Sequence, residues 1–389
     1  MSRVLVLNCG SSSVKYRLYD GEEVLRKGAV ERVGEPGGGP ADHETAVREI
    51  LDGLDQLDPT GLTGLTAVGH RVVHGGRRFA EPVLVDDAVF AAIEELVPLA
   101  PLHNPANLAG IRVAREALPG VPQVAVFDTA FHHTLPEAAA TYAIDRDTAR
   151  RYDIRRYGFH GTSHAYVSRR TAELLGRPYA ELNTITLHLG NGASACAVAG
   201  GHSVATSMGM SPLEGLVMGT RSGDLDPTVI FHLRREAGMG IDEIDDLLNH
   251  RSGLLGLAGV NDVREVLARR DAGDPAATLA LDVYTRRITG YVGAYYALLG
   301  RVDAVTFTAG VGEHAAGVRA AALAGLGRLG IAVDPARNDG DGDRVISPAG
   351  AEVAVCVIGT DEEREIAREA RTVAEAATAD WGDPPGRRP

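Results

Sequence analysis

The stretch VLVLNCGSSSVKYRLYD, residues 4–20, decides the fold. An apolar run, a turn of small residues and an alternating run that ends in Asp-Gly predict a β-hairpin. A second stretch, ITLHLGNGASACAVAGG at 185–201, follows the same plan, with His188 in the place of Asn8. The repetition favours two related domains whose hairpin turns face a shared cleft, and chance similarity between two glycine-rich hairpins is the alternative.

Other segments alternate between strand and helix patterns, which places the 389-residue chain in the α/β class with two domains. HETAVREILDGLDQL (43–57) has helical spacing, and QVAVFDTAFHH (123–133) has the pattern of a buried strand that ends in polar residues. RYGFHGTSHAYVSRRTAELLG (156–176) predicts a loop that enters a helix, with Thr162 or Ser163 as its N-cap.

Composition narrows the functional class. The net charge is −13, from 39 basic and 52 acidic residues, which disfavours nucleic-acid binding. Cys9, Cys196 and Cys356 lie far apart without a CxxC motif, so we expect no disulfide framework, no zinc site and a reducing cytoplasm. The sequence contains no apolar run of membrane-spanning length, and its first residues are too polar and too short for a signal peptide, so we expect no membrane partner.

Three turns of small residues after predicted strands are suited to binding phosphate groups. The first carries Ser11, Ser13 and Lys15, the second is HLGNGAS at 188–194, and the third is TAGVGEH at 308–314. Backbone N–H groups in such turns, and at the helix start after the third, attract anions. An ordinary tight hairpin explains the first turn alone, whereas three such turns favour a nucleotide. None of them is a Walker loop, because neither lysine follows a glycine.

Charged side chains at predicted strand ends suggest phosphoryl chemistry. Arg71 interrupts an apolar strand and Arg221 lies in GTRSGD, and either guanidinium could bind a carboxylate or phosphate or form a structural ion pair. Asp128 ends the strand VAVFD, and Glu362 follows VAVCVI, so these carboxylates are candidates for Mg²⁺. For Glu362, a favourable charge in the first turn of a helix is the alternative.

The motifs that contain these residues, in this order, resemble the acetate kinase (acetokinase) family from about residue 4 to about residue 370. The resemblance depends on VLVLNCGSSSVKY, AVGHRVVHGG, APLHNPAN, VFDTAFHHTLP, RYGFHGTSHAYV, LHLGNGAS, TSMGMSPLEGLVMGTRSGDLDP, FTAGVGE and IGTDEE.

The resemblance implies two duplicated actin-like (ribonuclease H-like) domains around a central nucleotide cleft. It assigns 1–132 plus 364–389 to the first domain, with a C-terminal helix that returns to it. It assigns 133–363 to the second, which would bind nucleotide and dimerise. It further implies reversible, direct in-line transfer of the ATP γ-phosphoryl group to acetate with Mg²⁺ (or Mn²⁺), in a cytoplasmic homodimer. A carboxylate is ionised at neutral pH, so it needs no strong general base.

Carried over position by position, the resemblance implies site residues of four kinds. The metal positions are Asn8 and Glu362. The catalytic positions are Arg71, Asp128, His160 and Arg221. The nucleotide positions are His188, Gly190, Asn191, Gly192, Asp262, Val263, Arg264, Gly310, Val311, Gly312, Glu313 and His314, to which the residue pattern of the turns adds Ser11, Ser13, Lys15 and Leu189. The acetate positions are Arg71 with an apolar pocket of Val73, Leu102, Phe159 and Pro212.

The sequence departs from the family pattern in three places. The usual Asn of GxGEN is His314, the usual PTNEE is GTDEE with Gly359 and Asp361, and the residue after the first Asn is Cys9. The first two departures leave the nucleotide preference open.

Three other readings compete with acetate kinase. Propionate kinase is the nearest. A nicotinamide dehydrogenase would use Gly310, Gly312, Ala315 and an acidic Asp334 at a strand end as a dinucleotide fingerprint. A nucleotide-gated, actin-like binding module would keep the phosphate turns without needing the arginines.

Overall fold

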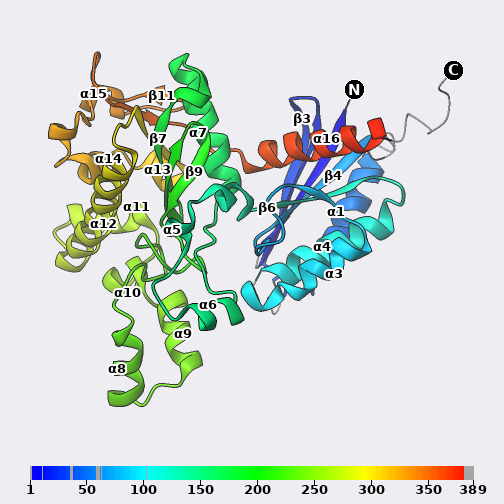
Figure 1. Ribbon diagram of the computed structural model, residues 1–389, viewed down its shortest axis with the longest axis horizontal. Helices are drawn as coiled ribbons and strands as arrows, with labels where there is room; N and C mark the ends of the chain where they lie inside the picture. Colours follow the sequence, from blue (N-terminus) through cyan, green and yellow to red (C-terminus); the bar gives the residue numbers. More distant parts are fainter. Residues whose placement is uncertain are drawn as a thin grey trace. The chain divides into compact units, whose positions relative to one another are not determined.

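The computed structural model divides into two compact units, which Figure 1 shows as two groups of helices and strands. Unit 1 is Met1–Phe131 with Asp361–Pro389, and unit 2 is His132–Thr360. The structure describes residues 2–10, 12–35, 38–57, 62, 64–101 and 103–380. The predicted site residues Ser11 and Leu102 lie outside the described residues.

Unit 1 is built on a six-stranded mixed sheet in the order β3-β2-β1-β4-β6-β5. The strands are β1 (Arg3–Cys9), β2 (Ser13–Asp20), β3 (Glu23–Glu31), β4 (Leu65–Val72), β5 (Val83–Leu84) and β6 (Gln123–Phe127). The predicted hairpin is β1 and β2, which pair antiparallel with Asn8 opposite Lys15. Strands β1, β4 and β6 run parallel, so their carboxyl ends meet at one edge of the sheet.

Helices cover both faces of this sheet (Figure 1). Unit 1 contains α1 (His43–Leu57), α3 (Asp87–Glu95), α4 (Asn104–Ala117) and α16 (Glu362–Asp380). Alternation along β1 sends Leu5 and Leu7 into the core with α1 and α4, and Val4 and Val6 into the core with α16. Helix α16 approaches β4 closely, because a Cβ on Gly69 would lie only 2.8 Å from Cγ2 of an α16 isoleucine. Helix α16, the last helix in the sequence, therefore packs in the same core as β1, the first strand.

Unit 2 repeats the topology of unit 1. Its sheet has the order β9-β8-β7-β10-β12-β11, which matches unit 1 strand for strand and in every parallel or antiparallel pairing. The strands are β7 (Asn183–Leu189), β8 (Ala193–Ala199), β9 (His202–Thr206), β10 (Ala304–Thr308), β11 (Arg344–Val345) and β12 (Ala354–Val357). His188 is the sixth residue of β7, as Asn8 is of β1. The internal repeat and the α/β class predicted from the sequence are confirmed.

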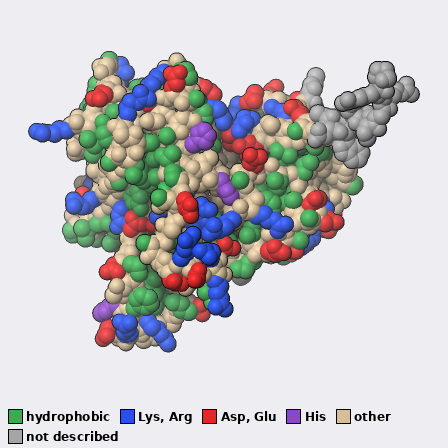
Figure 2. Space-filling view, viewed as in Figure 1, with side chains coloured by type: hydrophobic (Ala, Val, Ile, Leu, Met, Phe, Trp, Pro, Cys, Tyr) green, Lys and Arg blue, Asp and Glu red, His purple; other side chains and the backbone are tan. Residues whose placement is uncertain are grey.

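Unit 2 carries more helices than unit 1. They are α5 (Glu137–Ala140), α6 (Arg146–Arg151), α7 (Gly161–Leu175), α8 (Thr228–Glu236), α9 (Ile241–His250), α10 (Gly253–Ala258), α11 (Val263–Asp271), α12 (Pro275–Leu299), α13 (Ala309–His314), α14 (Ala316–Leu323) and α15 (Pro335–Asn338). No helix in the described part of the chain is long and apolar enough to cross a membrane. On the visible face of each unit, acidic and basic side chains are interspersed (Figure 2).

Two local predictions in unit 2 are wrong. The N-cap of α7 is His160, with φ of 55°, rather than Thr162 or Ser163, which are already helical. The third glycine-rich turn is the short helix α13, because Ala309 takes φ of 64° and the helix starts directly after β10. Both residues adopt the left-handed region at the end of a loop or strand, a conformation that a sequence pattern does not reveal.

Candidate active site

In unit 1, polar side chains gather at the carboxyl ends of the parallel strands β1, β4 and β6. Arg71 near the end of β4 donates from Nε to Oδ1 of Asp128 at 2.9 Å and from Nη2 to Oδ2 at 2.6 Å. Its Nη1 donates to Oδ1 of Asn8 at 3.3 Å. Parallel α/β sheets bind ligands at this edge. The structure therefore brings together three of the predicted site residues of unit 1.

The start of α16 adds two carboxylates to this cluster. Glu362 lies 4.0 Å from Nη1 of Arg71, and Glu363 accepts a hydrogen bond from Nδ2 of Asn8 at 3.3 Å. Burial raises the pKa of Glu362, Arg71 opposes the shift, and Asp128 adds to it. Burial also disfavours the charge on Arg71, but Asp128 and Glu362 outweigh it and raise the arginine pKa. Three carboxylates, those of Asp128, Glu362 and Glu363, thus lie near the Arg71 guanidinium.

The donor set fits a hard divalent cation. Carboxylate and amide oxygens are the ligands that Mg²⁺ prefers, usually one or two of them completed by water and substrate phosphates. Asn8 and Glu362 offer such oxygens beside the carboxylates of Asp128 and Glu363. Among the described residues, no three His, Cys, Asp or Glu side chains are arranged to hold a metal by themselves. The residues therefore fit a cation that keeps several water ligands.

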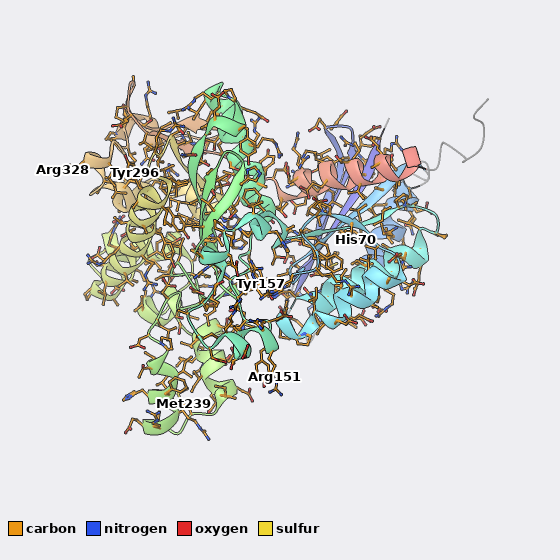
Figure 3. The ribbon with its side chains drawn as sticks, in the orientation of Figure 1. His70, Arg151, Tyr157, Met239, Tyr296 and Arg328 are labelled. Carbon is orange, nitrogen blue, oxygen red and sulfur yellow. The ribbon has the colours of Figure 1, made fainter. Side chains whose placement is uncertain are left out.

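Other predicted or polar residues near the Arg71 cluster lie either in the core of unit 1 or on its surface. His70 lies in β4 (Figure 3), where its Nε2 is 2.8 Å from Oε1 of Gln123 and burial lowers its pKa to about 4. It is a neutral core histidine. Lys15 is exposed on β2 opposite Asn8, and Ser13 accepts through its backbone carbonyl from Gly10 N at 2.7 Å in the hairpin turn.

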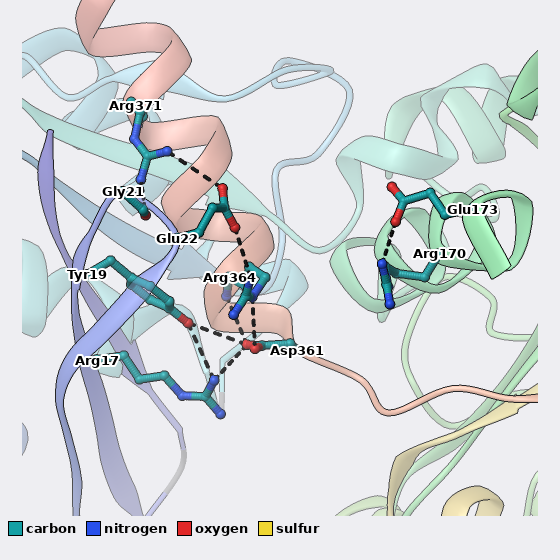
Figure 4. A network of polar contacts seen from close by, with 9 residues as sticks. All are labelled: Arg17, Tyr19, Gly21, Glu22, Arg170, Glu173, Asp361, Arg364 and Arg371. Carbon is teal, nitrogen blue, oxygen red and sulfur yellow. Dashed lines mark hydrogen bonds and ion pairs between the residues drawn. The ribbon is translucent and has the colours of Figure 1, made fainter. Parts of the chain in front are cut away.

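An ion-pair network fixes the beginning of α16 to the hairpin β2-β3 (Figure 4). Arg17 donates to Asp361 at 2.7 Å and lies 3.4 Å from Glu363, so it holds the residues on both sides of Glu362. Arg364 bonds Asp361 and, at 2.8 Å, Glu22. The sequence did not identify Arg17 as a site-supporting residue. Its charge inside a hairpin of mostly small and apolar residues was the available signal.

In unit 2, the second predicted turn follows β7. Gly190 N donates to Gly192 O at 2.9 Å, and Gly219 N donates to Asn191 O at 2.9 Å, so the turn is fastened to the loop that carries Arg221. A Cβ on Gly219 would lie 2.0 Å from Oδ1 of Asn191, so a side chain at this position would displace the Asn191 amide. Leu189, the last residue of β7 and the residue before this turn, is buried.

Two predicted histidines stack beside this turn. The rings of His160 and His188 lie 4.2 Å apart at an interplanar angle of 21°. Nδ1 of His188 is 2.8 Å from Oγ of Ser163, and Nδ1 of His160 is 2.9 Å from Oγ of Ser194. Each ring is therefore held through Nδ1 by a serine hydroxyl. The sequence analysis named Ser163 only as an N-cap candidate and Ser194 only as the end of the second turn, and it did not foresee that either serine holds a histidine.

Arg221 is a partly buried cation that has no acidic partner among the described residues of unit 2. Its Nη1 donates to the carbonyl of Pro212 at 3.1 Å and lies 3.7 Å from Sδ of Met218. Within the described part of unit 2, no carboxylate forms an ion pair with it, and burial lowers its pKa. A Cβ on Gly192 would lie 3.7 Å from Nη1 of Arg221 and 3.5 Å from Nε2 of His160. The guanidinium and the imidazole therefore face one point at the turn.

A pocket of about 460 Å³ lies next to the turn in unit 2. Eight predicted nucleotide residues line it: Gly190, Asn191, Asp262, Val263, Arg264, Gly310, Val311 and His314. Asn261, Leu267 and Ala315 complete the lining. Leu267 lies four residues after Val263 on α11, so helical spacing was a signal that could have found it. The volume is in the range of small-molecule and cofactor sites.

The pocket rim carries an exposed ion pair. Nη2 of Arg264 lies 2.5 Å from Oδ2 of Asp262, whose carboxylate also caps α11 by accepting from Arg264 N at 2.8 Å. Hydrogen bonds from the side chain and backbone of Arg264 lower the pKa of Asp262 to about 2. Behind the rim, Glu313 accepts from Thr360 N at 3.1 Å, and the buried Gly312 lies against β10.

The residues predicted for the apolar acetate pocket belong to different units. Val73 is buried in unit 1 and donates through its backbone N–H to Asn107 at 3.0 Å. In unit 2, Phe159 is buried, and Pro212 accepts the hydrogen bond from Arg221.

The structure does not support the dinucleotide-binding fingerprint of a nicotinamide dehydrogenase. Asp334 does not end a strand but caps the short helix α15, where its carboxylate accepts from Ala336 N at 2.9 Å. A dinucleotide fingerprint needs that carboxylate at the end of the next strand, where it reaches the ribose.

The chain is similar to several known proteins. The family model described as "Acetokinase family" matches residues 3–368. An acetate kinase of Streptomyces coelicolor is 61% identical, with 94% of this chain and 95% of that protein covered. The crystal structure of Porphyromonas gingivalis acetate kinase has a TM-score of 0.90 and 44% identity over 96% of this chain and all of that one. A propionate kinase structure from Francisella tularensis also has a TM-score of 0.90, with 39% identity over 96% of this chain and all of that one.

Proposed function

The chain belongs to the acetokinase family, and on this basis we propose that it transfers the γ-phosphoryl group of ATP to acetate, reversibly, giving acetyl phosphate and ADP. It is a kinase whose acceptor is a carboxyl group. Propionate is the alternative acceptor, given the likeness to a propionate kinase structure.

Arg221 is the observation that carries the proposal. A desolvated guanidinium with no acidic partner in the described part of its unit is a site for an anion that arrives with the substrate. It faces the same point as Nε2 of His160, at a turn that leads into the pocket. Phosphoryl transfer needs positioned positive charge and hydrogen-bond donors around the transferring group. We assign that role to Arg221 and His160.

Arg71 and Asp128 have different roles in this proposal. Both oxygens of Asp128 are engaged by Arg71, at 2.9 and 2.6 Å, so the carboxylate is poorly placed to act as a nucleophile. We propose that Asp128 orients Arg71, and that Arg71 binds the carboxylate of acetate. Direct transfer then requires no covalent intermediate. Val73, Phe159 and Pro212 would contact the methyl group.

We propose Mg²⁺, with Mn²⁺ as a substitute, at Asn8 and Glu362. When bound, the cation would neutralise charge on the phosphate oxygens. The protein contributes the oxygen donors and, through Arg17, the position of the helix start that carries Glu362. The pocket beside the turn at Gly190 would hold the nucleotide, with His188 and α13 near its phosphates.

We propose a cytoplasmic homodimer. The proposal rests on the family resemblance, and exposed apolar side chains of unit 2, among them Phe231 at 56% and Leu298 at 68%, are candidates for the dimer surface. The three free cysteines are all buried thiols, which is consistent with a reducing compartment. Light scattering after gel filtration tests the dimer, and a mass of one chain contradicts it.

Hydroxamate trapping tests the activity. The protein is incubated with ATP, Mg²⁺ and acetate, and acyl phosphate is captured with hydroxylamine. We expect product that requires all three reactants and is largely lost in Arg221→Ala. No product with acetate, but product with propionate, would replace acetate with the alternative acceptor. No product with either acid would refute the proposal.

A further inference from the structure

A chain of three hydrogen bonds connects His160 with the interior of unit 2. Nδ1 of His160 lies 2.9 Å from Oγ of Ser194, which lies 2.8 Å from Nε2 of His164. Nδ1 of His164 lies 2.7 Å from Oγ1 of Thr186. Ser194, His164 and Thr186 are fully buried. Water therefore does not compete for these bonds, and the three side chains must satisfy one another.

The proton count gives this chain a direction. Burial, with smaller contributions from two neighbouring histidines, lowers the pKa of His164 well below its ordinary value, so the ring is neutral and has one N–H. The hydroxyl of Thr186 lies 3.5 Å from the carbonyl oxygen of Cys196, which can only accept. One arrangement that satisfies all of these atoms directs the single proton of Thr186 to that carbonyl, and in it Nδ1 of His164 donates to Thr186.

The same count continues toward His160. Because its only proton is on Nδ1, His164 accepts at Nε2 from the hydroxyl of Ser194. Ser194 has then used its one proton, and it can only accept from Nδ1 of His160. Nδ1 of His160 therefore carries a proton. Its Nε2 is the atom that lies, with Nη1 of Arg221, around the position of a Cβ on Gly192.

We propose that Ser194 and His164 are positioning residues for His160: they keep a proton on Nδ1 and present Nε2 to the phosphoryl group. Since Nδ1 already donates, a second proton at Nε2 requires no rearrangement behind the ring, and the imidazolium is ready to donate to phosphoryl oxygens. The catalytic part of this inference depends on the proposed phosphoryl transfer. The position of the proton on His160 does not.

Nitrogen NMR of protein labelled with ¹⁵N-histidine tests the proton position directly. The signals of His160 are assigned by their loss in His160→Gln. In the neutral ring we expect the proton on Nδ1. Thr186→Val removes the far acceptor with little change in volume, so the chain can reverse, and we expect the neutral His160 to shift toward the Nε2–H form. A wild-type ring with its proton on Nε2, or His160 signals unchanged in Thr186→Val, would overturn the inference.

Kinetics test the positioning role. Ser194→Ala removes the acceptor of Nδ1, and we expect kcat to fall roughly 10- to 100-fold, the range for a lost hydrogen bond to a charged group, with the KM for ATP and acetate unchanged. Ser203→Ala is the matched control, because Ser203 is equally buried and its hydroxyl lies 2.8 Å from Nδ1 of His132 instead. We expect its kcat to stay near that of the wild type.

The outcomes separate this inference from the proposed function. Wild-type kcat in Ser194→Ala, or an equal loss in Ser203→Ala, would reduce the chain to a structural role and overturn the positioning claim. If Ser194→Ala does not fold, Ser194→Cys keeps the volume with a weaker acceptor, and its kcat must fall for the claim to stand. A wild-type protein that makes no acyl phosphate would refute the function, and the NMR measurement would still decide the position of the proton.

Discussion

Arg71 and Arg221 are expected to differ in what their loss does to folding. Arg71 is tied to Asp128 by two short hydrogen bonds, and the Asp128 side chain is only 3% exposed. Arg71→Ala therefore leaves a buried carboxylate without its partner. Arg221→Ala removes a cation that has no acidic partner in the described part of unit 2. Both variants should lose most of their activity, but for different reasons.

The magnitudes follow from the two environments. Removing one partner of a buried ion pair costs about 3–5 kcal/mol, which lowers the thermal midpoint of a domain of this size by roughly 6–20 °C. Arg221→Ala loses one hydrogen bond to a carbonyl, about 1 kcal/mol, and that loss is offset because a desolvated charge is removed. Its kcat should nevertheless fall roughly 10²–10³-fold, as for the loss of one donor to a developing charge.

Calorimetry and hydroxamate kinetics on the same preparations test this difference. The double variant Arg71→Ala/Asp128→Asn removes the uncompensated charge, so it should recover most of the midpoint lost in Arg71→Ala while remaining largely inactive. Equal midpoints for the Arg71→Ala and Arg221→Ala proteins would refute the reasoning. So would a double variant that is no more stable than Arg71→Ala.

Three further predictions concern the metal, the acceptor and pH. Glu362→Gln should raise the Mg²⁺ concentration needed for half-maximal rate. It should also weaken Mn²⁺ binding, which is measured by electron paramagnetic resonance without substrates. Unchanged Mg²⁺ and Mn²⁺ titration curves would leave Glu362 with only the role of a favourable charge at the helix start. Wild type should prefer acetate over propionate by roughly tenfold to a few hundredfold in kcat/KM, and Val73→Ala should narrow that ratio mainly through the KM for propionate; an unmoved ratio would remove Val73 from the acceptor pocket. Stability should fall as pH drops from about 6.5 toward 4, because the folded state holds His70 neutral until about pH 4 while the unfolded chain binds that proton near 6.5. His70→Gln should flatten this part of the stability curve, and an identical slope would contradict the assignment.

The sequence predicted those features that depend on local signals. Alternation and the Asp-Gly turn predicted the hairpin β1-β2, and its repeat predicted β7-β8 because the same strand-turn-strand pattern recurs. The acetokinase family was likewise predictable, since the resemblance depends on long motifs in a fixed order. Eight predicted nucleotide residues line one pocket because the turn after β7, the start of α11 and the helix α13 come together there.

Features that depend on distant contacts were not predictable. Arg17 and Asp361 are separated by 344 positions, and only the folded sheet and α16 bring them together. The bond between Ser194 and His160 depends on α7 lying against β8, which no spacing in the sequence encodes. The left-handed conformations of His160 and Ala309 depend on the surrounding structure, and they account for the wrong N-cap and the wrong turn. The roles of these residues in catalysis stay predictions.

The central claim is that a carboxylate oxygen of acetate attacks the γ-phosphorus of ATP. Acetate labelled with ¹⁸O in both oxygens tests it most directly, with the product followed by ³¹P NMR. The account predicts acetyl phosphate whose phosphorus signal shows the isotope shift of a bridging ¹⁸O, formed with ADP and formed roughly 10²–10³-fold more slowly by Arg221→Ala. Acetyl phosphate with an unlabelled bridge would mean that a phosphate oxygen attacked an activated acetyl group, and it would contradict the account.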